Sequence, residues 1–151
     1  MKKPTDAVEF ETMLLARHVH LRSLRRQTVD GQLDRSAYVL LTRIQKDGPM
    51  SIGQLRDAFG LDVSTLNRQT AAMMREDLIE RIPDPDGGIA RKFRITGHGE
   101  QRLDADRAWN IKALDSVLAE WTPEEVAGFA AVLRRFNTDI ERLDGRPWPR
   151  S

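Results

Sequence analysis

The stretch from residue 51 to residue 77, SIGQLRDAFGLDVSTLNRQTAAMMRED, carries polar side chains at a helical spacing that suits contact with DNA. At about 100° per residue, Leu66, Thr70 and Met73 fall on one side of a helix. The small and polar residues of the other side are Ser64, Thr65, Asn67, Arg68, Ala71, Ala72 and Arg75. Small side chains allow a helix to enter the major groove, which is about 12 Å wide. The pattern predicts a recognition helix, and a core helix with a polar outer face is the alternative.

Two of these side chains have a specific chemistry toward bases. Arg68 has a planar fork of donors that fits the two acceptors of guanine, and the amide of Asn67 can pair with adenine. Short hydroxyls and a second arginine supply further hydrogen bonds to base edges or phosphates. We therefore predict that the major groove is contacted by Ser64, Thr65, Asn67, Arg68 and Arg75.

A turn-rich stretch, DPDGGIARKFRITG at residues 84–97, follows the short β-prone run IERI. Its prolines and glycines separate IERI from a second run, IARKFRI, as in a hairpin with a long tip. Such a hairpin beside a recognition helix can lie along the DNA backbone or in the adjacent minor groove. Arg91, Lys92 and Arg94 would make these contacts. A linker with a solvated basic strand is the alternative.

Capping signals predict the helices that position these residues. Ser51 and Gln54 form a capping-box pair that opens a short helix, which Gly60 closes, and Asp62 can cap the recognition helix. A short helix, a tight turn and a second capped helix have the spacing of a helix-turn-helix.

Longer helices are predicted on both sides of this unit. Apolar periodicity indicates a first helix from Asp6 to Gln27, and Asp34 can cap a second one that KDGP ends at residues 46–49. Thr96 can cap a long helix that runs to about Glu120. A second capping box, Thr122 with Glu125, starts the last helix, and the tail GRPWPRS is predicted to be flexible.

Composition excludes several classes of function. The 151 residues contain no cysteine, and 24 basic against 23 acidic residues give a net charge of +1. His18 and His20 diverge on a helix and His98 is remote, so the sequence shows no metal triad, and we expect neither an enzyme nor a bound cofactor. No apolar run is long enough for a membrane span and no secretory signal is visible, so we expect a cytoplasmic protein without a membrane partner.

The chain resembles the MarR family of bacterial transcriptional regulators over nearly its whole length. The motifs that carry the resemblance are GPMSIGQLRDAFGLDVSTLNRQT, LIERIPDPD and FRITGHGE, in family order and spacing. It implies a mainly α fold with a small β-hairpin wing, in which a winged helix-turn-helix is joined to a helical dimerisation region. The predicted divisions are an N-terminal dimerisation helix (1–33), the DNA-binding domain (34–96), C-terminal dimerisation helices (97–143) and a flexible tail (144–151).

The wing departs from the family pattern at one place. Members of the family usually carry an aspartate, one residue and then an arginine after the tip. When Ile95-Thr96 is matched to the family's usual Leu-Thr, Gly87 and Ile89 stand at these two positions. The family's minor-groove arginine is therefore missing where it is expected. Arg91 could replace it, or the wing could contact phosphates alone; Asp84 and Asp86 would repel phosphates if they faced them.

The resemblance also implies a homodimer and a small aromatic or phenolic effector. Candidate interface residues, each of which could equally be intrachain core, are Phe10, Leu14, Leu118, Phe129, Leu133, Phe136 and Ile140. Candidate effector-binding residues are His18, Tyr38 and Trp109, although a lone histidine on an apolar face can also be a core residue.

The sequence thus predicts a homodimeric regulator that binds double-stranded DNA and represses a palindromic operator from which an aromatic ligand could release it. The alternative is a winged-helix module that binds proteins and no DNA, which the near-neutral charge and the altered wing favour.

Overall fold

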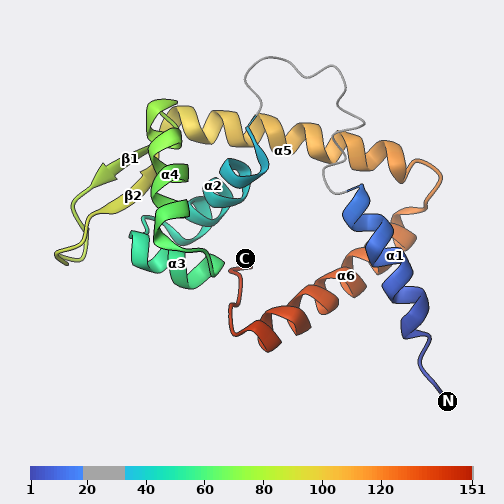
Figure 1. The fold of residues 1–151 in the computed structure, drawn as a ribbon. Coiled ribbons are helices and arrows are strands. Elements are labelled where there is room, and N and C mark those ends of the chain that lie inside the picture. The colour runs from blue at the N-terminus through green and yellow to red at the C-terminus, as the bar shows by residue number, and fades with distance from the viewer. Residues whose placement is uncertain (19–32, 151) are drawn as a thin grey trace.

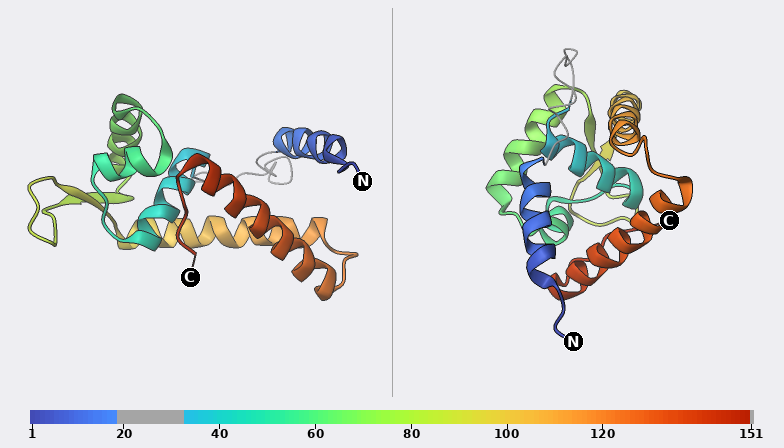
Figure 2. Two further views of the ribbon diagram at one scale, coloured as in Figure 1. Left: turned by 90° about the horizontal axis from the view of Figure 1, so that it is seen from below. Right: turned by 90° about the vertical axis from the view of Figure 1, so that its right-hand side faces the viewer.

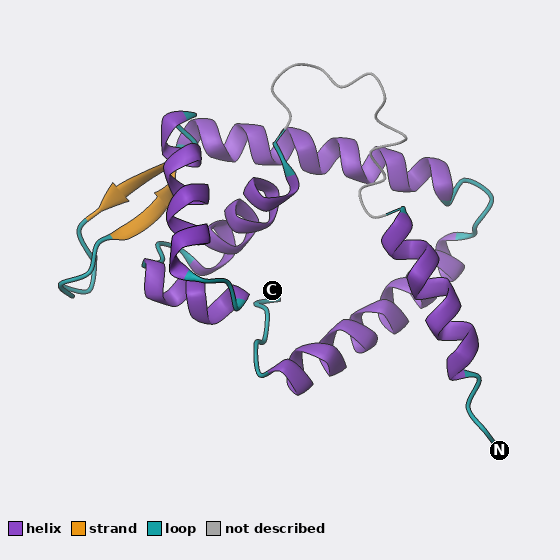
Figure 3. Ribbon diagram, viewed as in Figure 1, coloured by secondary structure: helices purple, strands orange, loops and turns teal. Residues whose placement is uncertain are grey.

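The chain folds into a mainly helical structure with one hairpin (Figures 1 and 3). The computed structural model describes residues 1–18 and 33–150. The elements are α1 (Thr5–Arg17), α2 (Arg35–Asp47), α3 (Ile52–Phe59), α4 (Val63–Arg75), β1 (Ile79–Ile82), β2 (Lys92–Ile95), α5 (Gly97–Val117) and α6 (Pro123–Asp144). This order confirms the predicted fold class. Among the described residues, no helix has both the length and the apolar character needed to cross a bilayer.

The predicted caps begin five of these helices. The Asp34 carboxylate accepts the Ala37 N–H at 2.8 Å, and the Thr96 hydroxyl accepts the Gly99 N–H at 2.9 Å. Both capping boxes are formed, at the start of α3 and at the start of α6. Asp62 caps α4. These bonds confirm the capping predictions. Such caps can be predicted from the sequence because each bond joins residues two or three positions apart.

One predicted helix end differs from the structure, and another lies outside the described residues. The helix after Thr96 ends at Val117, three residues before Glu120. The first helix is described from Thr5 to Arg17, with His18 as its C-cap. The remainder of the predicted helix, to Gln27, lies outside the described residues.

The main core lies between α2, α3, α4, the hairpin and the first half of α5. Its side chains, each with 3% exposure or less, include Leu40, Leu41, Ile44, Leu55, Leu66, Met73, Leu78, Phe93 and Leu103. We call α2–α4 with the hairpin the winged unit, and β1, β2 and the tip between them the wing. Because Leu103 belongs to α5, this helix is packed into the winged unit at its first half.

The hairpin has a third participant that the sequence did not predict. β1 and β2 pair antiparallel, with Glu80 opposite Arg94 and Arg81 opposite Phe93. On the other edge of β2, Met50 exchanges both backbone hydrogen bonds with Phe93, at 3.1 and 2.8 Å. The segment before α3 is therefore fixed to the base of the wing.

Two further contacts, besides the packing of Leu103, hold α5 against the winged unit and a residue that precedes it. The backbone of Gly99 lies so close to the Leu78 carbonyl that a Cβ on this glycine would be 2.1 Å from the oxygen. Farther along, the buried Asp106 accepts the Leu33 N–H at 3.1 Å. The first contact needs a residue without a side chain, and the second pairs a backbone N–H at the entry into α2 with a side-chain oxygen of α5.

The remaining helices extend away from this core. α5 leads out of the winged unit, and α6 returns so that its C-terminal end lies near α3 (Figures 1 and 2). No residue within Thr5–Arg17 or Pro123–Asp144 is buried. Their apolar side chains are therefore exposed or half-buried in the single chain.

Candidate nucleic-acid interface

Helix α4 presents the predicted outer face to solvent. Leu66, Thr70 and Met73 are buried, as expected for the inner face. The buried Thr70 hydroxyl donates to the Leu66 carbonyl at 2.8 Å, so its burial leaves no unpaired donor. Of the predicted DNA contacts on this helix, Thr65 is half-buried and the exposed ones are Ser64, Asn67, Arg68 and Arg75.

The start of α4 is held by the carboxylate of Asp62. This carboxylate accepts the Ser64 hydroxyl and the Thr65 N–H, both at 2.7 Å. The pKa of Asp62 falls from 3.8 to about 2, chiefly because of the Ser64 hydrogen bond, then of the Thr65 N–H, with a smaller contribution from the charge of Arg68. Because the Ser64 proton is directed to Asp62, the Ser64 oxygen faces solvent as an acceptor, which suits the amino group of cytosine or adenine.

The cap makes the start of α4 sensitive to acid. The folded pKa of Asp62 lies below its ordinary value, so its contribution to stability is complete above about pH 4 and is lost as pH falls toward 2. We expect a carboxyl titration followed by NMR to give a midpoint near 2, and Ser64→Ala to raise it, because the largest cause is removed. Asp62→Asn identifies the resonance. An unchanged midpoint in Ser64→Ala would contradict this account.

Two of the three predicted wing cations have partners inside the wing. Lys92 lies 3.4 Å from the Asp84 carboxylate, and the Arg94 guanidinium pairs with Glu80 on the facing strand. The pKa of Asp84 is lowered, first by the Asp86 N–H and then by Lys92. The charge of Asp84 is therefore offset within the wing, which reduces the repulsion of phosphates expected from the sequence. Arg91 is exposed and forms no ion pair with a described residue.

A cavity of about 400 Å³ lies between the wing and the first turn of α3. Its lining residues are Ser51, Ile52, Gly53, Arg81, Ala90, Arg91 and Phe93. The Arg81 guanidinium lies 5.4 Å from the centre of the Phe93 ring. Arg81 and Arg91 thus line a cavity at the positive end of α3, and both the helix end and the two arginines favour an anion such as phosphate. Arg81 is not among the predicted DNA contacts, because its position depends on the pairing of β1 with β2.

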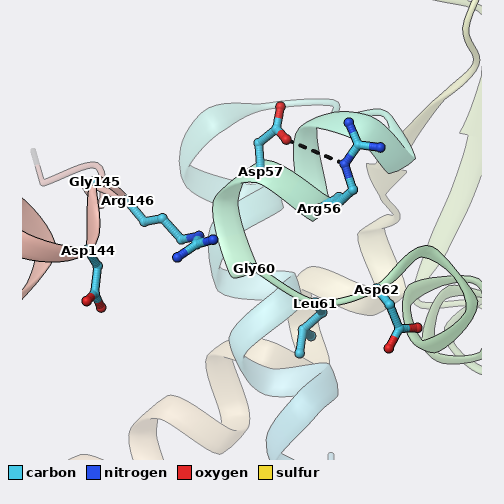
Figure 4. A pocket seen from close by; sticks show the side chains of 8 residues that line it. All are labelled: Arg56, Asp57, Gly60, Leu61, Asp62, Asp144, Gly145 and Arg146. Carbon is cyan, nitrogen blue, oxygen red and sulfur yellow. Dashed lines mark ion pairs between the residues drawn. The ribbon is translucent and has the colours of Figure 1, made fainter.

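A second cavity, of about 560 Å³, adjoins the turn between α3 and α4 (Figure 4). It is lined by Arg56, Asp57, Gly60, Leu61, Asp62, Asp144, Gly145 and Arg146. The side chain of Arg146 extends from the end of α6 toward Gly60. Cations and carboxylates alternate around this cavity, so it has no single sign of charge.

The residues predicted for an effector lie on three different helices. His18 is exposed at the end of α1, Trp109 is 45% exposed on α5, and Tyr38 is half-buried on α2 against the core. None of the three lines the two cavities described above or a third one at residues 137–150.

The predicted interface residues are not core in the single chain. Phe10 is 52% exposed, and Leu14 and Leu118 are half-buried. On α6 an apolar stripe consists of Phe129, Val132, Leu133, Phe136, Ile140 and Leu143, all exposed. We call this set the α6 stripe.

The sequence and the fold are both similar to those of known proteins. Residues 33–87 match the sequence profile of the MarR family. YxaD of Bacillus subtilis (strain 168), an uncharacterized HTH-type transcriptional regulator, is 36% identical over 137 residues, which cover 90% of this chain and 94% of YxaD. A MarR family protein from Bacillus stearothermophilus has a TM-score of 0.74 at 20% identity, covering 93% of this chain and 99% of that one. The PcaV regulator of Streptomyces coelicolor, solved with its natural ligand, has a TM-score of 0.59 at 22% identity, covering 82% and 89%.

Proposed function

The chain belongs to the MarR family of transcriptional regulators, and from this premise we propose that it is a homodimeric, sequence-specific DNA-binding protein. It acts in the cytoplasm as a repressor at a palindromic operator. Helix α4 enters the major groove, and the wing contacts the backbone beside it.

The outer face of α4 is the observation that carries this proposal. Arg68, Asn67 and Ser64 are exposed on the side opposite the buried Leu66 and Met73. Their donors and acceptors match the groups that base edges present in the major groove. The cavity between α3 and the wing, with Arg81 and Arg91, is suited to a phosphate of the same duplex.

The α6 stripe supports the homodimer. Large side chains such as Phe129, Leu133 and Phe136, between 38% and 49% exposed, lie on one face of α6, and exposed apolar patches of this kind mark interaction surfaces. A twofold axis would bury the stripes of two chains with the apolar residues of α1 and α5. The two α4 helices would then lie one DNA turn apart, about 34 Å.

Selection of bound fragments from a random double-stranded DNA pool tests the proposal. At about 150 mM salt, a level at which weak non-specific binding is suppressed, we expect an enriched inverted repeat with half-sites one turn apart. Binding without enrichment, lost at modest salt, would favour the alternative module that binds protein. That alternative predicts a complex with little dependence on salt, since an apolar interface releases few counterions.

Arg91→Ala should weaken binding to all sequences equally. Because Arg91 is exposed and unpaired among the described residues, its guanidinium is available for a phosphate. Loss of one phosphate contact per protomer should make the slope of log K against log salt shallower by roughly 1.8 for a dimer. Lys92→Ala is the matched control, since Lys92 is paired with Asp84 and should change the slope less. An unaltered slope in Arg91→Ala would remove this residue from the interface.

Phe136→Glu should convert the dimer into monomer. It places a charge in the middle of the α6 stripe, where burial without a partner is costly. Thr138→Glu adds the same side chain on the opposite side of α6 and should leave the dimer intact. Sedimentation at matched concentrations distinguishes the two. A dimeric Phe136→Glu variant would place the interface elsewhere.

An aromatic effector at His18, Tyr38 and Trp109 stays a prediction. Its support is that PcaV, a structural neighbour, was solved in complex with its natural ligand.

A further inference from the structure

The last described residues return to the winged unit. α6 ends at Asp144, the φ of 69° at its C-cap Gly145 turns the chain, and the Arg146 N–H bonds to the Glu141 carbonyl at 3.1 Å. Beyond this turn, the Trp148 ring meets Phe59, the last residue of α3, edge to face at 5.5 Å and 87°. The Arg43 guanidinium of α2 lies 4.9 Å from the centre of the same indole. The sequence predicted a flexible tail, whereas Trp148 has contacts on two helices of the winged unit.

Glu141 holds the same segment on α6. One of its carboxylate oxygens accepts the backbone N–H of Trp148 and a guanidinium N–H of Arg150, both at 2.7 Å. The pKa of Glu141 is lowered, chiefly by Arg150, then by the Trp148 N–H, with a contribution from Arg43. The segment 146–150 is therefore fixed to α6 by the Glu141 carboxylate and to α2 and α3 by the Trp148 indole.

Arg146 adds a contact with the turn that precedes α4. A Cβ on Gly60 would lie 2.8 Å from the Arg146 Cζ atom, so the guanidinium lies directly over this glycine (Figure 4). Gly60 also has a φ of 65°, which makes any side chain there strained. The segment thus reaches the helix-turn-helix at the turn as well as at Phe59.

These contacts are a second connection between the winged unit and the terminal helices. The first connection is α5, which is packed into the winged unit through Gly99 and Leu103. The second approaches from the end of α6, away from α5 (Figure 1). A unit attached only through α5 follows every tilt of that helix relative to α6, whereas a unit attached at two places has one preferred angle to α6.

We propose that Trp148 is a positioning residue that fixes the winged unit relative to α6, and thereby sets the distance between half-sites that the dimer accepts. This inference rests on the proposed function, a dimer on an inverted repeat. When the angle between the winged unit and α6 is fixed before binding, an operator of the matching spacing binds without the entropy cost of fixing that angle. Binding at another spacing requires the contacts of Trp148 with Phe59 and Arg43 to break.

The test measures Kd on duplexes that carry the selected half-sites at the best spacing and at spacings one and two base pairs longer and shorter. Trp148→Ala should lose about threefold to tenfold in affinity at the best spacing, the value of an aromatic pair. It should lose less at the other spacings, so its profile is flatter than that of the wild type. Trp148→Phe keeps an aromatic edge against Phe59 and should restore the profile.

Trp121→Ala is the matched control. Trp121 forms a similar edge-to-face pair with Phe129, at 5.6 Å and 81°, within the connection of α5 to α6. It should keep the wild-type spacing profile if it remains dimeric. If Trp148→Ala loses its helical circular dichroism, Glu141→Gln replaces it, since this change weakens only the hold on α6 and should also flatten the profile.

The outcomes separate the two proposals. An unchanged spacing profile in Trp148→Ala, with wild-type DNA binding intact, overturns the role of Trp148 alone. If Trp121→Ala flattens the spacing profile as much as Trp148→Ala does, the role of Trp148 is overturned too. The effect would then come from a general loosening of the terminal helices. Failure of the wild-type chain to prefer any inverted repeat overturns the proposed function, and the inference about Trp148 with it.

Discussion

Gly99→Ala is expected to destabilise the fold by about 3 kcal/mol or more, the upper range for overpacking a well-packed site. The added Cβ would stand 2.1 Å from the Leu78 carbonyl oxygen and 3.0 Å from the Ile95 side chain. The oxygen is part of the backbone and cannot rotate away, so α5 must move off the base of the wing. The Thr96 hydroxyl, which donates to the carbonyls of Asp77 and Leu78, would lose its geometry as well.

Thermal unfolding measures this effect directly. For a chain of this size, about 3 kcal/mol corresponds to a decrease in Tm of roughly 6–12 °C, compared at one protein concentration. Gly97→Ala is the matched control, because Gly97 is in the same helical turn and nothing lies within 4 Å of its added Cβ. It should be neutral or slightly stabilising. A Gly99→Ala variant as stable as Gly97→Ala would mean that α5 does not approach Leu78 so closely.

Arg68→Ala is expected to abolish operator preference at one position of each half-site. A bidentate contact with guanine contributes about 1–3 kcal/mol of discrimination, and a dimer has two such contacts, so the operator should bind about 30-fold more weakly at least. Arg68 is exposed on the outer face of α4, so its loss should leave the fold intact. Competition between the selected operator and variants at each position measures the effect.

Two further variants identify the kind of contact. Arg68→Lys keeps the charge but loses the planar fork, so it should lose base preference while retaining the salt dependence. Arg135→Ala removes an exposed arginine from α6, far along the chain from the winged unit, and should bind as the wild type does. If Arg68→Lys binds and discriminates like the wild type, Arg68 contacts a phosphate and another residue contacts the base.

Local signals explain why the sequence predicted the helices and the exposed face of α4. The cap at Asp62 and the capping boxes at Ser51 and Thr122 join residues two or three positions apart, so a short stretch of sequence is enough to predict each of them. The inner face of α4 follows from helical periodicity in the same way. The buried residues Leu66, Thr70 and Met73 confirm it.

Contacts between distant residues could not be predicted in this way. Met50 pairs with Phe93, and Trp148 packs against Phe59, across 43 and 89 positions of the chain. No local pattern marks either pair. The partners of Lys92 and Arg94 depend likewise on the register of the hairpin, which a sequence with a long tip leaves open.

The length of α5 has a consequence for how small movements reach DNA. The helix has 21 residues, so it is a rod about 30 Å long. Because its first turn is packed against Leu78, the rod and the winged unit move together. A tilt of about 10° at the far end displaces the DNA-binding end by about 5 Å. That exceeds the rise of one base pair, about 3.4 Å. In the proposed dimer on an inverted repeat, a lever of this length would convert a small tilt between the terminal helices into a loss of register on the operator.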